Sequence, residues 1–232
     1  MTISTLSLQN YTLLIAGIIN LVMSILVFSR GIKHNKVNRY FSLLTFFNFL
    51  WALSLFFARV LPTNDWLFWA RLAYPSSLGI ALSLFYFSVY FPFAIKKISK
   101  VVNYIIILPA IFFTIIPYVN NLFIISYSKH IEQTLYILYY NKLLYISFGV
   151  YFSILVFITI IHLIKKYKVS ENIFRKQILF LLIAIVIGLI AGSYFDLIIC
   201  YFGNFKHAWA GPPFTLLMNF VVFYLIFHNK EN

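Results

Sequence analysis

The sequence predicts an all-α integral membrane protein, a bundle of seven transmembrane helices. Three observations predict this fold class: the composition, the length of the apolar runs, and the alternation of charge between the connections that join them. Of the 232 residues, 62% are hydrophobic and 10% are charged, against about 45–50% and about 25% in soluble domains. A soluble fold could not shield so much apolar surface from water. We therefore expect a single seven-span membrane domain over residues 1–232.

Seven apolar runs are each long enough to cross the hydrocarbon core, which takes about 20 residues of helix. The fourth run is short and contains Pro109, with Pro117 at its end, so six spans with a re-entrant fourth segment are the alternative. The first run follows neither a positively charged segment nor a small-residue cleavage signature, which indicates a retained span and not a removed signal peptide. The predicted spans are residues 11–29, 40–61, 67–95, 101–117, 141–164, 178–200 and 211–228.

The basic residues predict the orientation of these spans. Most of the 18 lysines and arginines follow the first, third, fifth and seventh spans. The positive-inside rule therefore places the N-terminus outside and the C-terminus in the cytoplasm. The net charge of +13 is explained by attraction to anionic headgroups, so the predicted partner is the lipid bilayer and not a nucleic acid.

The connection between the fourth and fifth spans is the only one with a pattern of its own. The runs LFIISYS and TLYILYY are rich in Ile, Tyr and Phe, alternate in part, and flank the polar KHIEQ. This pattern predicts a small external β-hairpin or an interfacial flap. Tyr and Phe at that depth are also common as headgroup anchors.

Charged residues inside a span are costly and therefore mark candidate sites. Arg59, Arg71 and Asp196 are the three in this chain, and their positions along the spans place all of them in the outer layer of the bundle. We expect Asp196 to pair with Arg71 or Arg59 at the floor of an external cavity. Alternatively, an arginine near a helix end can extend its charged group to the interface while its stem stays in lipid.

The sixth span carries a stripe of small residues. Ala184, Gly188, Gly192 and Asp196 recur every four residues, and Gly188 and Gly192 form a G-x-x-x-G that lets another helix approach closely. Packing within the chain is favoured, because Asp196 on the same face is unfavourable toward lipid. A dimer face is the alternative.

The sequence gives no sign of an enzyme. The span 211–228 contains no lysine, which excludes a retinal Schiff base, and the five histidines lie in loops or at helix ends without a partner at metal-ligand spacing. Cys200 is the single cysteine, so no disulfide or cysteine-based metal site is expected within the chain. We predict no catalytic residue, no metal and no cofactor.

Spans two and three resemble the N-terminal seven-transmembrane region of bacterial histidine kinases. The shared features are Trp51, the external turn, then Trp69-Ala70-Arg71 with Tyr74 a turn later, and a long span that ends at Phe91-Pro92. The last span is similar too, with Tyr224-Leu225-Ile226 leading to Lys230. The resemblance implies a sensor in a prokaryotic plasma membrane, oriented with its N-terminus outside, whose last helix passes a signal to an output domain. Its matching positions are Trp51, Arg71 and Tyr74; Asp196 does not rest on it.

Only four residues follow His228, so we expect no output domain in this chain. The predicted function is a stand-alone membrane sensor or receptor-like module that signals through a separate cytoplasmic or membrane protein. An unknown ligand is expected to bind or couple through Trp51, Arg71, Tyr74 and Asp196. A small transporter or a membrane assembly subunit is the alternative, although transporters usually show inverted repeats and broken helices.

Overall fold

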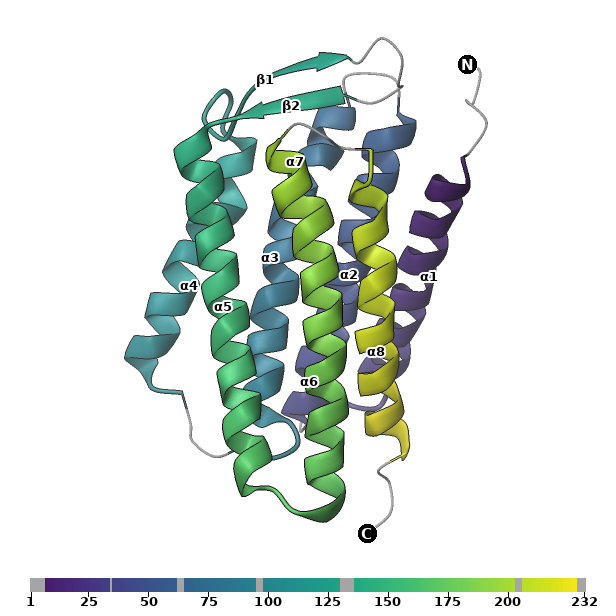
Figure 1. The fold of residues 1–232 in the computed structure, drawn as a ribbon, viewed down its shortest axis with the longest axis vertical. Helices are drawn as coiled ribbons and strands as arrows, with labels where there is room; N and C mark the ends of the chain where they lie inside the picture. The colour runs from purple at the N-terminus through teal and green to yellow at the C-terminus, as the bar shows by residue number, and fades with distance from the viewer. Residues whose placement is uncertain are drawn as a thin grey trace.

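Seven helices that are long and apolar enough to cross a bilayer run side by side in the described part of the chain (Figure 1). The structure is a computed structural model that describes residues 7–33, 35–61, 65–94, 98–129, 136–202 and 206–228. The helices are α1 (Leu8–Ser29), α2 (Lys36–Val60), α3 (Trp66–Tyr90), α4 (Lys100–Ile115), α5 (Lys142–Val169), α6 (Asn172–Gly192) and α8 (Gly211–His228). This arrangement confirms the predicted all-helical bundle with seven candidate spans.

Short segments extend three of these helices. The 3₁₀ turn η1 (Ile116–Tyr118) continues α4, so the fourth candidate span covers 19 residues, Lys100–Tyr118, although Pro109 lies inside it. The π-helical segment η2 (Ser193–Ile198) and the short helix α7 (Ile199–Tyr201) continue α6. The 3₁₀ turn η3 (Ala208–Ala210) leads into α8.

The helices differ from the predicted spans mainly at their ends. Side-chain caps start α2, α4 and α5: Asn35, Ser99 and Asn141 each accept a hydrogen bond from a backbone N–H three residues on. Apolar runs mark only the lipid-facing part of a helix, so α2 begins at Lys36, before residue 40, and α5 continues past residue 164 to Val169. Span three was predicted to reach residue 95, which is wrong for the helix. It ends at Tyr90, because Pro92 forces Phe91 into an extended conformation.

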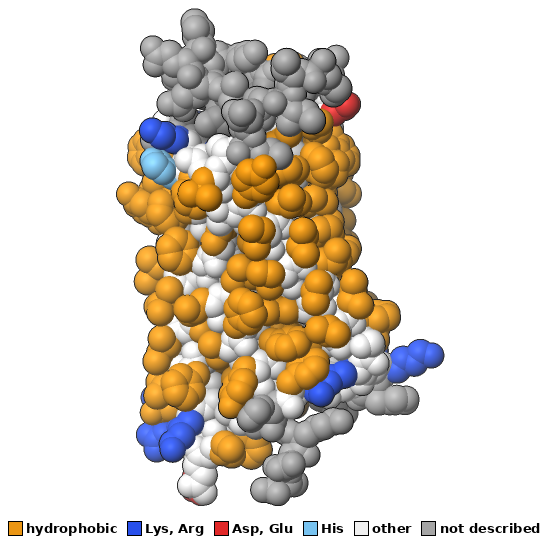
Figure 2. Space-filling view, turned by 90° about the vertical axis from the view of Figure 1, so that its right-hand side faces the viewer, with side chains coloured by type: hydrophobic (Ala, Val, Ile, Leu, Met, Phe, Trp, Pro, Cys, Tyr) orange, Lys and Arg blue, Asp and Glu red, His pale blue; other side chains and the backbone are white. Residues whose placement is uncertain are grey.

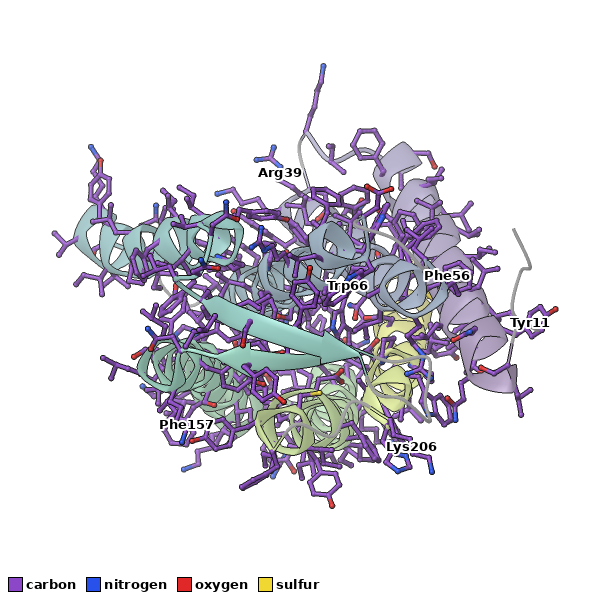
Figure 3. All side chains as sticks on the ribbon, turned by 90° about the horizontal axis from the view of Figure 1, so that it is seen from above. Tyr11, Arg39, Phe56, Trp66, Phe157 and Lys206 are labelled. Carbon is purple, nitrogen blue, oxygen red and sulfur yellow. The ribbon has the colours of Figure 1, made fainter. Side chains whose placement is uncertain are left out.

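Two strands close one end of the bundle. β1 (Ile124–Lys129) and β2 (Tyr136–Tyr140) pair antiparallel, with Tyr127 opposite Leu138. Figure 3 looks down on this end and shows the sheet crossing over the helix ends, where Trp66 of α3 contacts the ring of Tyr127. Most of the polar KHIEQ run lies outside the described residues. We call this end the sheet end; α1 begins there, and α8 ends at the opposite end.

The side of the bundle is an apolar belt with charge at one end. Figure 2 shows hydrophobic side chains covering the middle of the molecule, with most of its visible Lys and Arg side chains toward the lower end. Exposed apolar residues of this kind include Ile18, Ile105, Phe157 and Ile190. The basic connections α1–α2 and α5–α6 both lie toward that lower end, which we call the basic end (Figure 1).

Candidate functional site

A cavity of about 140 Å³ lies inside the sheet end of the bundle, between α2, α3, α5, α6 and α8. We call it the sheet-end cavity. Its walls are mostly apolar and aromatic, and Leu138 and Tyr140 of β2 contribute to its lining. Most of the predicted site residues line it: Trp51, Tyr74, Gly188, Gly192 and Asp196.

Two buried polar atoms of the cavity lining have no hydrogen-bond partner. They are Oδ2 of Asp196 and Nε1 of Trp209, and both belong to the described part of the chain. Nearly all buried polar atoms in native proteins are paired, and leaving one unpaired costs about 1–3 kcal/mol. An acceptor and a donor therefore line one apolar cavity with their hydrogen-bonding capacity unused. A ligand that supplies a donor for Asp196 and an acceptor for Trp209 would satisfy both.

Asp196 is carried by the π-helical segment η2. Such segments are frequently found at functional sites. Here the hydroxyl of Tyr145 on α5 donates to the carbonyls of Asp196 and Leu197, at 3.3 and 3.1 Å. Tyr145 thereby holds η2 in place beside the cavity.

Tyr74 connects the sheet to the same region. Its hydroxyl donates to the hydroxyl of Tyr140 on β2, and its ring packs edge-on against Tyr145 and Phe148 of α5. Burial raises the pKa of the Tyr140 phenol well above its ordinary value, so this hydroxyl stays neutral at physiological pH. One aromatic cluster thus joins β2, α3, α5 and η2.

Two glycines of α6 leave space for neighbouring groups: Gly188 for the backbone of α8, and Gly192 for the aromatic ring of Trp51. A Cβ at Gly188 would lie 3.6 Å from the carbonyl oxygen of Phe214, which shows that α6 and α8 approach closely there. A Cβ at Gly192 would lie 3.8 Å from Cη2 of Trp51. The stripe that includes buried Ala184 therefore packs within this chain.

The predicted ion pair between Asp196 and an arginine is wrong. Arg71 points elsewhere: its Nη2 donates to Oδ1 of Asn120 at 3.2 Å, and it does not line the cavity. Arg59 lines the cavity, but its guanidinium donates to Gln9 and to Asn10 of α1. Oδ2 of Asp196 has no partner among the described residues. Each arginine therefore has partners other than Asp196, and only Arg59 shares the cavity lining with it.

Sequence reasoning missed four residues of the site: Tyr140, Tyr145, Trp209 and Gly211. Tyr140 ends the TLYILYY run and was read only as part of an aromatic-rich connection, whereas Tyr145 lies inside the predicted span 141–164 and was not singled out there. Gly211 is followed by Pro212 and Pro213, and a glycine directly before a Pro-Pro helix start is a signal for close approach of another element. Trp209 carries no signal that separates it from a headgroup anchor.

The sequence matches the family described as the N-terminal 7TM region of histidine kinase, over residues 12–230. The chain belongs to this family. A search among curated proteins gives no match. Membership of the histidine-kinase seven-transmembrane family makes the chain a sensor-type membrane region and confirms the predicted family resemblance. The family's seven-transmembrane region is a non-catalytic domain.

Proposed function

We propose that the chain is a membrane sensor that binds a small, largely apolar ligand in the sheet-end cavity. The observation that carries this proposal is the pair of unpartnered polar atoms, Asp196 Oδ2 and Trp209 Nε1, in an otherwise apolar cavity. A cavity of about 150 Å³ in another protein holds one benzene molecule, so the volume of about 140 Å³ fits a ligand built on a single ring. The ligand class is a small aromatic or cyclic molecule with one hydrogen-bond donor and one acceptor.

The cavity is built so that a ligand would bias the position of α8. Ala208 and Trp209 lead into α8 and Thr215 belongs to it, whereas Asp196 belongs to η2. A ligand bridging Asp196 and Trp209 favours the arrangement in which these two elements are close, and differential affinity of this kind shifts a conformational equilibrium. At the far end of α8, the guanidinium of Arg30 lies 3.4 Å from the ring centroid of Phe227 and donates to the carbonyl of Ile226. A movement of α8 therefore reaches the basic end.

In this proposal the sheet end faces the outside of a prokaryotic plasma membrane, and the basic end faces the cytoplasm. The charge difference between the two ends supports the orientation. The chain then signals through a separate partner protein that reads the position of α8 at the basic end. The family supports the signalling role, because it is described as the N-terminal 7TM region of histidine kinase.

Binding is tested with 4-bromophenol, which offers one ring, one hydroxyl and a heavy atom that quenches tryptophan emission. Trp51, Trp66 and Trp209 line the cavity, and Trp69 does not. We expect saturable quenching in the purified chain that persists in Trp69→Phe. Asp196→Leu should weaken binding about five- to thirtyfold, since a lost buried hydrogen bond corresponds to about 1–2 kcal/mol.

Two controls separate the loss of a hydrogen bond from a loss of shape. Bromobenzene lacks the hydroxyl, so it should bind the wild type and Asp196→Leu with similar affinity. Asp65→Leu removes an acidic group that lies directly before α3 and does not itself line the cavity, and it should leave 4-bromophenol binding unchanged. Equal affinity of 4-bromophenol for the wild type and Asp196→Leu would show that the carboxyl group does not hold the ligand.

A further inference from the structure

A second hollow lies near the other end of the bundle, between α3, α4 and α5. It has a volume of about 520 Å³, and we call it the α4 groove. Its walls are apolar over most of their length, with Phe85 from α3, Val102 and Ile105 from α4, and Ile158 from α5. The side chains of Val102 and Ile105 are about half and two-thirds exposed, at 45% and 64%. The groove therefore opens sideways, on the lipid-facing surface of the bundle.

The groove exists because α4 packs on α5 in its C-terminal half and diverges from α5 toward the basic end. Near the sheet end, the ring of Phe113 on α4 packs on Phe148 and Tyr151 of α5, and the Tyr151 hydroxyl donates to the carbonyl of Ile106. Toward the basic end, α4 leans away from α5 (Figures 1 and 3). In this part of α4, among the described residues, one side-chain hydrogen bond joins the helix to the bundle: the hydroxyl of Tyr86 on α3 donates to Oδ1 of Asn103.

Positive charge is concentrated at the basic end of the groove. Lys165 and Lys166 of α5 line it there together with His162. Lys166 is buried, and its ammonium group donates to the carbonyls of Val89, Phe91 and Phe93, so it is fixed in place without a carboxylate. Lys165 is exposed beside it, and Nδ1 of His162 is buried without a hydrogen-bond partner in the described part of the chain.

The depth of these cations matches the headgroup layer. Helix α5 is 28 residues long, and at about 1.5 Å per residue Lys165 lies about 35 Å from its start. The hydrocarbon core of a bilayer is about 30 Å thick. The apolar part of the groove around Ile158 therefore lies at acyl-chain depth, whereas His162 and Lys165, about 30 and about 35 Å from the start of α5, lie where phosphate groups are found.

We propose that the α4 groove is a binding site for one anionic phospholipid, with an acyl chain between α4 and α5 and the phosphate at Lys165 and His162. Charge complementarity selects this occupant: among the described residues, Lys165 and Lys166 have no carboxylate partner, and they lie at the wet end of an apolar groove that is open to the bilayer. Basic pockets between transmembrane helices are a recognised form of headgroup site. The bound lipid would complete the packing of α4 and so support the part of α3 that Lys166 holds.

The test is native mass spectrometry of the full chain released from micelles that contain phosphatidylglycerol or phosphatidylcholine with the same acyl chains. We expect one phosphatidylglycerol to be retained per chain, at least about five times more than phosphatidylcholine. Lys165→Gln should remove most of this preference. Lys168→Gln is the matched control, because Lys168 is also exposed near the end of α5 but does not line the groove, and it should behave as the wild type.

A second variant tests the apolar part of the site without changing charge. Ile105→Trp fills the groove and should lower phosphatidylglycerol retention while the circular dichroism spectrum stays unchanged. Excess inorganic phosphate should not displace the lipid, because the acyl chain contributes to binding. Equal retention of both lipids, equal effects of Lys165→Gln and Lys168→Gln, or a second copy of the chain in place of the lipid would each overturn the proposal.

Discussion

The start of α8 leaves no room for a side chain at Gly211. A Cβ built there would lie 2.7 Å from Cη2 of Trp51 and would overlap Oδ2 of Asp196. Both neighbours line the sheet-end cavity. Glycine is required here for close approach and not for an unusual backbone conformation, since no positive φ is found at this position.

Gly211→Ala should therefore both destabilise the chain and weaken ligand binding. Overpacking a tightly packed site costs about 1–3 kcal/mol, and the displaced groups are Trp51 and Asp196. We expect a lower midpoint of thermal unfolding in detergent and weaker quenching by 4-bromophenol.

Gly149→Ala is the matched control for this substitution. Gly149 lies inside α5 with no atom within 4 Å of an added Cβ. Alanine is favoured over glycine inside a helix by about 1 kcal/mol, so this variant should raise the unfolding midpoint and leave 4-bromophenol binding intact. Unfolding shifts of the same sign in the two variants would show that the packing around Gly211 does not explain its effect.

At the scale of single residues, the sequence predicted which residues belong to the site better than it predicted which residues contact one another. Asp196 was singled out by its charge, and Trp51 and Tyr74 by family resemblance, and all three line the cavity. The Asp196 pairing failed because distance along a helix gives depth but not direction. Arg71 and Tyr74 are three residues apart on α3, yet Arg71 reaches Asn120 while Tyr74 reaches Tyr140.

At the scale of elements, Lys166 fixes the C-terminal end of α3 to α5. Phe91 and Phe93 lie beyond the last helical residue, Tyr90, and their carbonyls and that of Val89 accept from the Lys166 ammonium group. Helix ends leave carbonyls without partners inside the helix. The lysine satisfies them where Pro92 stops the chain from continuing the helix.

Lys166→Met should lower the free energy of unfolding by at least about 2 kcal/mol, because it leaves three carbonyls near a buried position without their donor. The measurement is thermal unfolding in detergent with Lys165→Met as the comparison. Lys165 is the exposed neighbour on the same helix, and its loss should change stability by less than about 0.5 kcal/mol. Similar losses in the two variants would contradict the fixing role of Lys166.

Hydropathy was enough to predict which segments form long helices, because each apolar run must satisfy its backbone internally in lipid. It could not predict η2, within which the carbonyls of Asp196 and Leu197 accept hydrogen bonds from Tyr145 of α5, because hydropathy carries no information on contacts between distant segments. It also could not show that β2 contributes Tyr140 to the cavity. Both features depend on contacts between residues about 50 or more positions apart in the chain.

At the scale of the whole molecule, the two hollows lie toward opposite ends of the bundle. The sheet-end cavity contacts α8 and η2, and the α4 groove contacts α3, α4 and α5. Helices α3 and α5 contribute to both. If the proposed ligand binds at one end and the proposed lipid at the other, the sensor requires a fixed orientation, which the uneven distribution of basic residues predicts.

Labelling from outside the cell tests this orientation directly. Cys200 is the single cysteine, so Cys200→Ser provides a cysteine-free background into which Lys206→Cys or Lys168→Cys is placed. Lys206 lies at the sheet end and Lys168 at the basic end, and both are exposed. With a membrane-impermeant maleimide on intact cells, Lys206→Cys should be labelled and Lys168→Cys should stay unlabelled until the membrane is permeabilised. The two sites carry the same change on the same background, so a difference reports only which side each end faces. The reverse pattern would place the sheet end in the cytoplasm and would remove the external ligand from the proposed function.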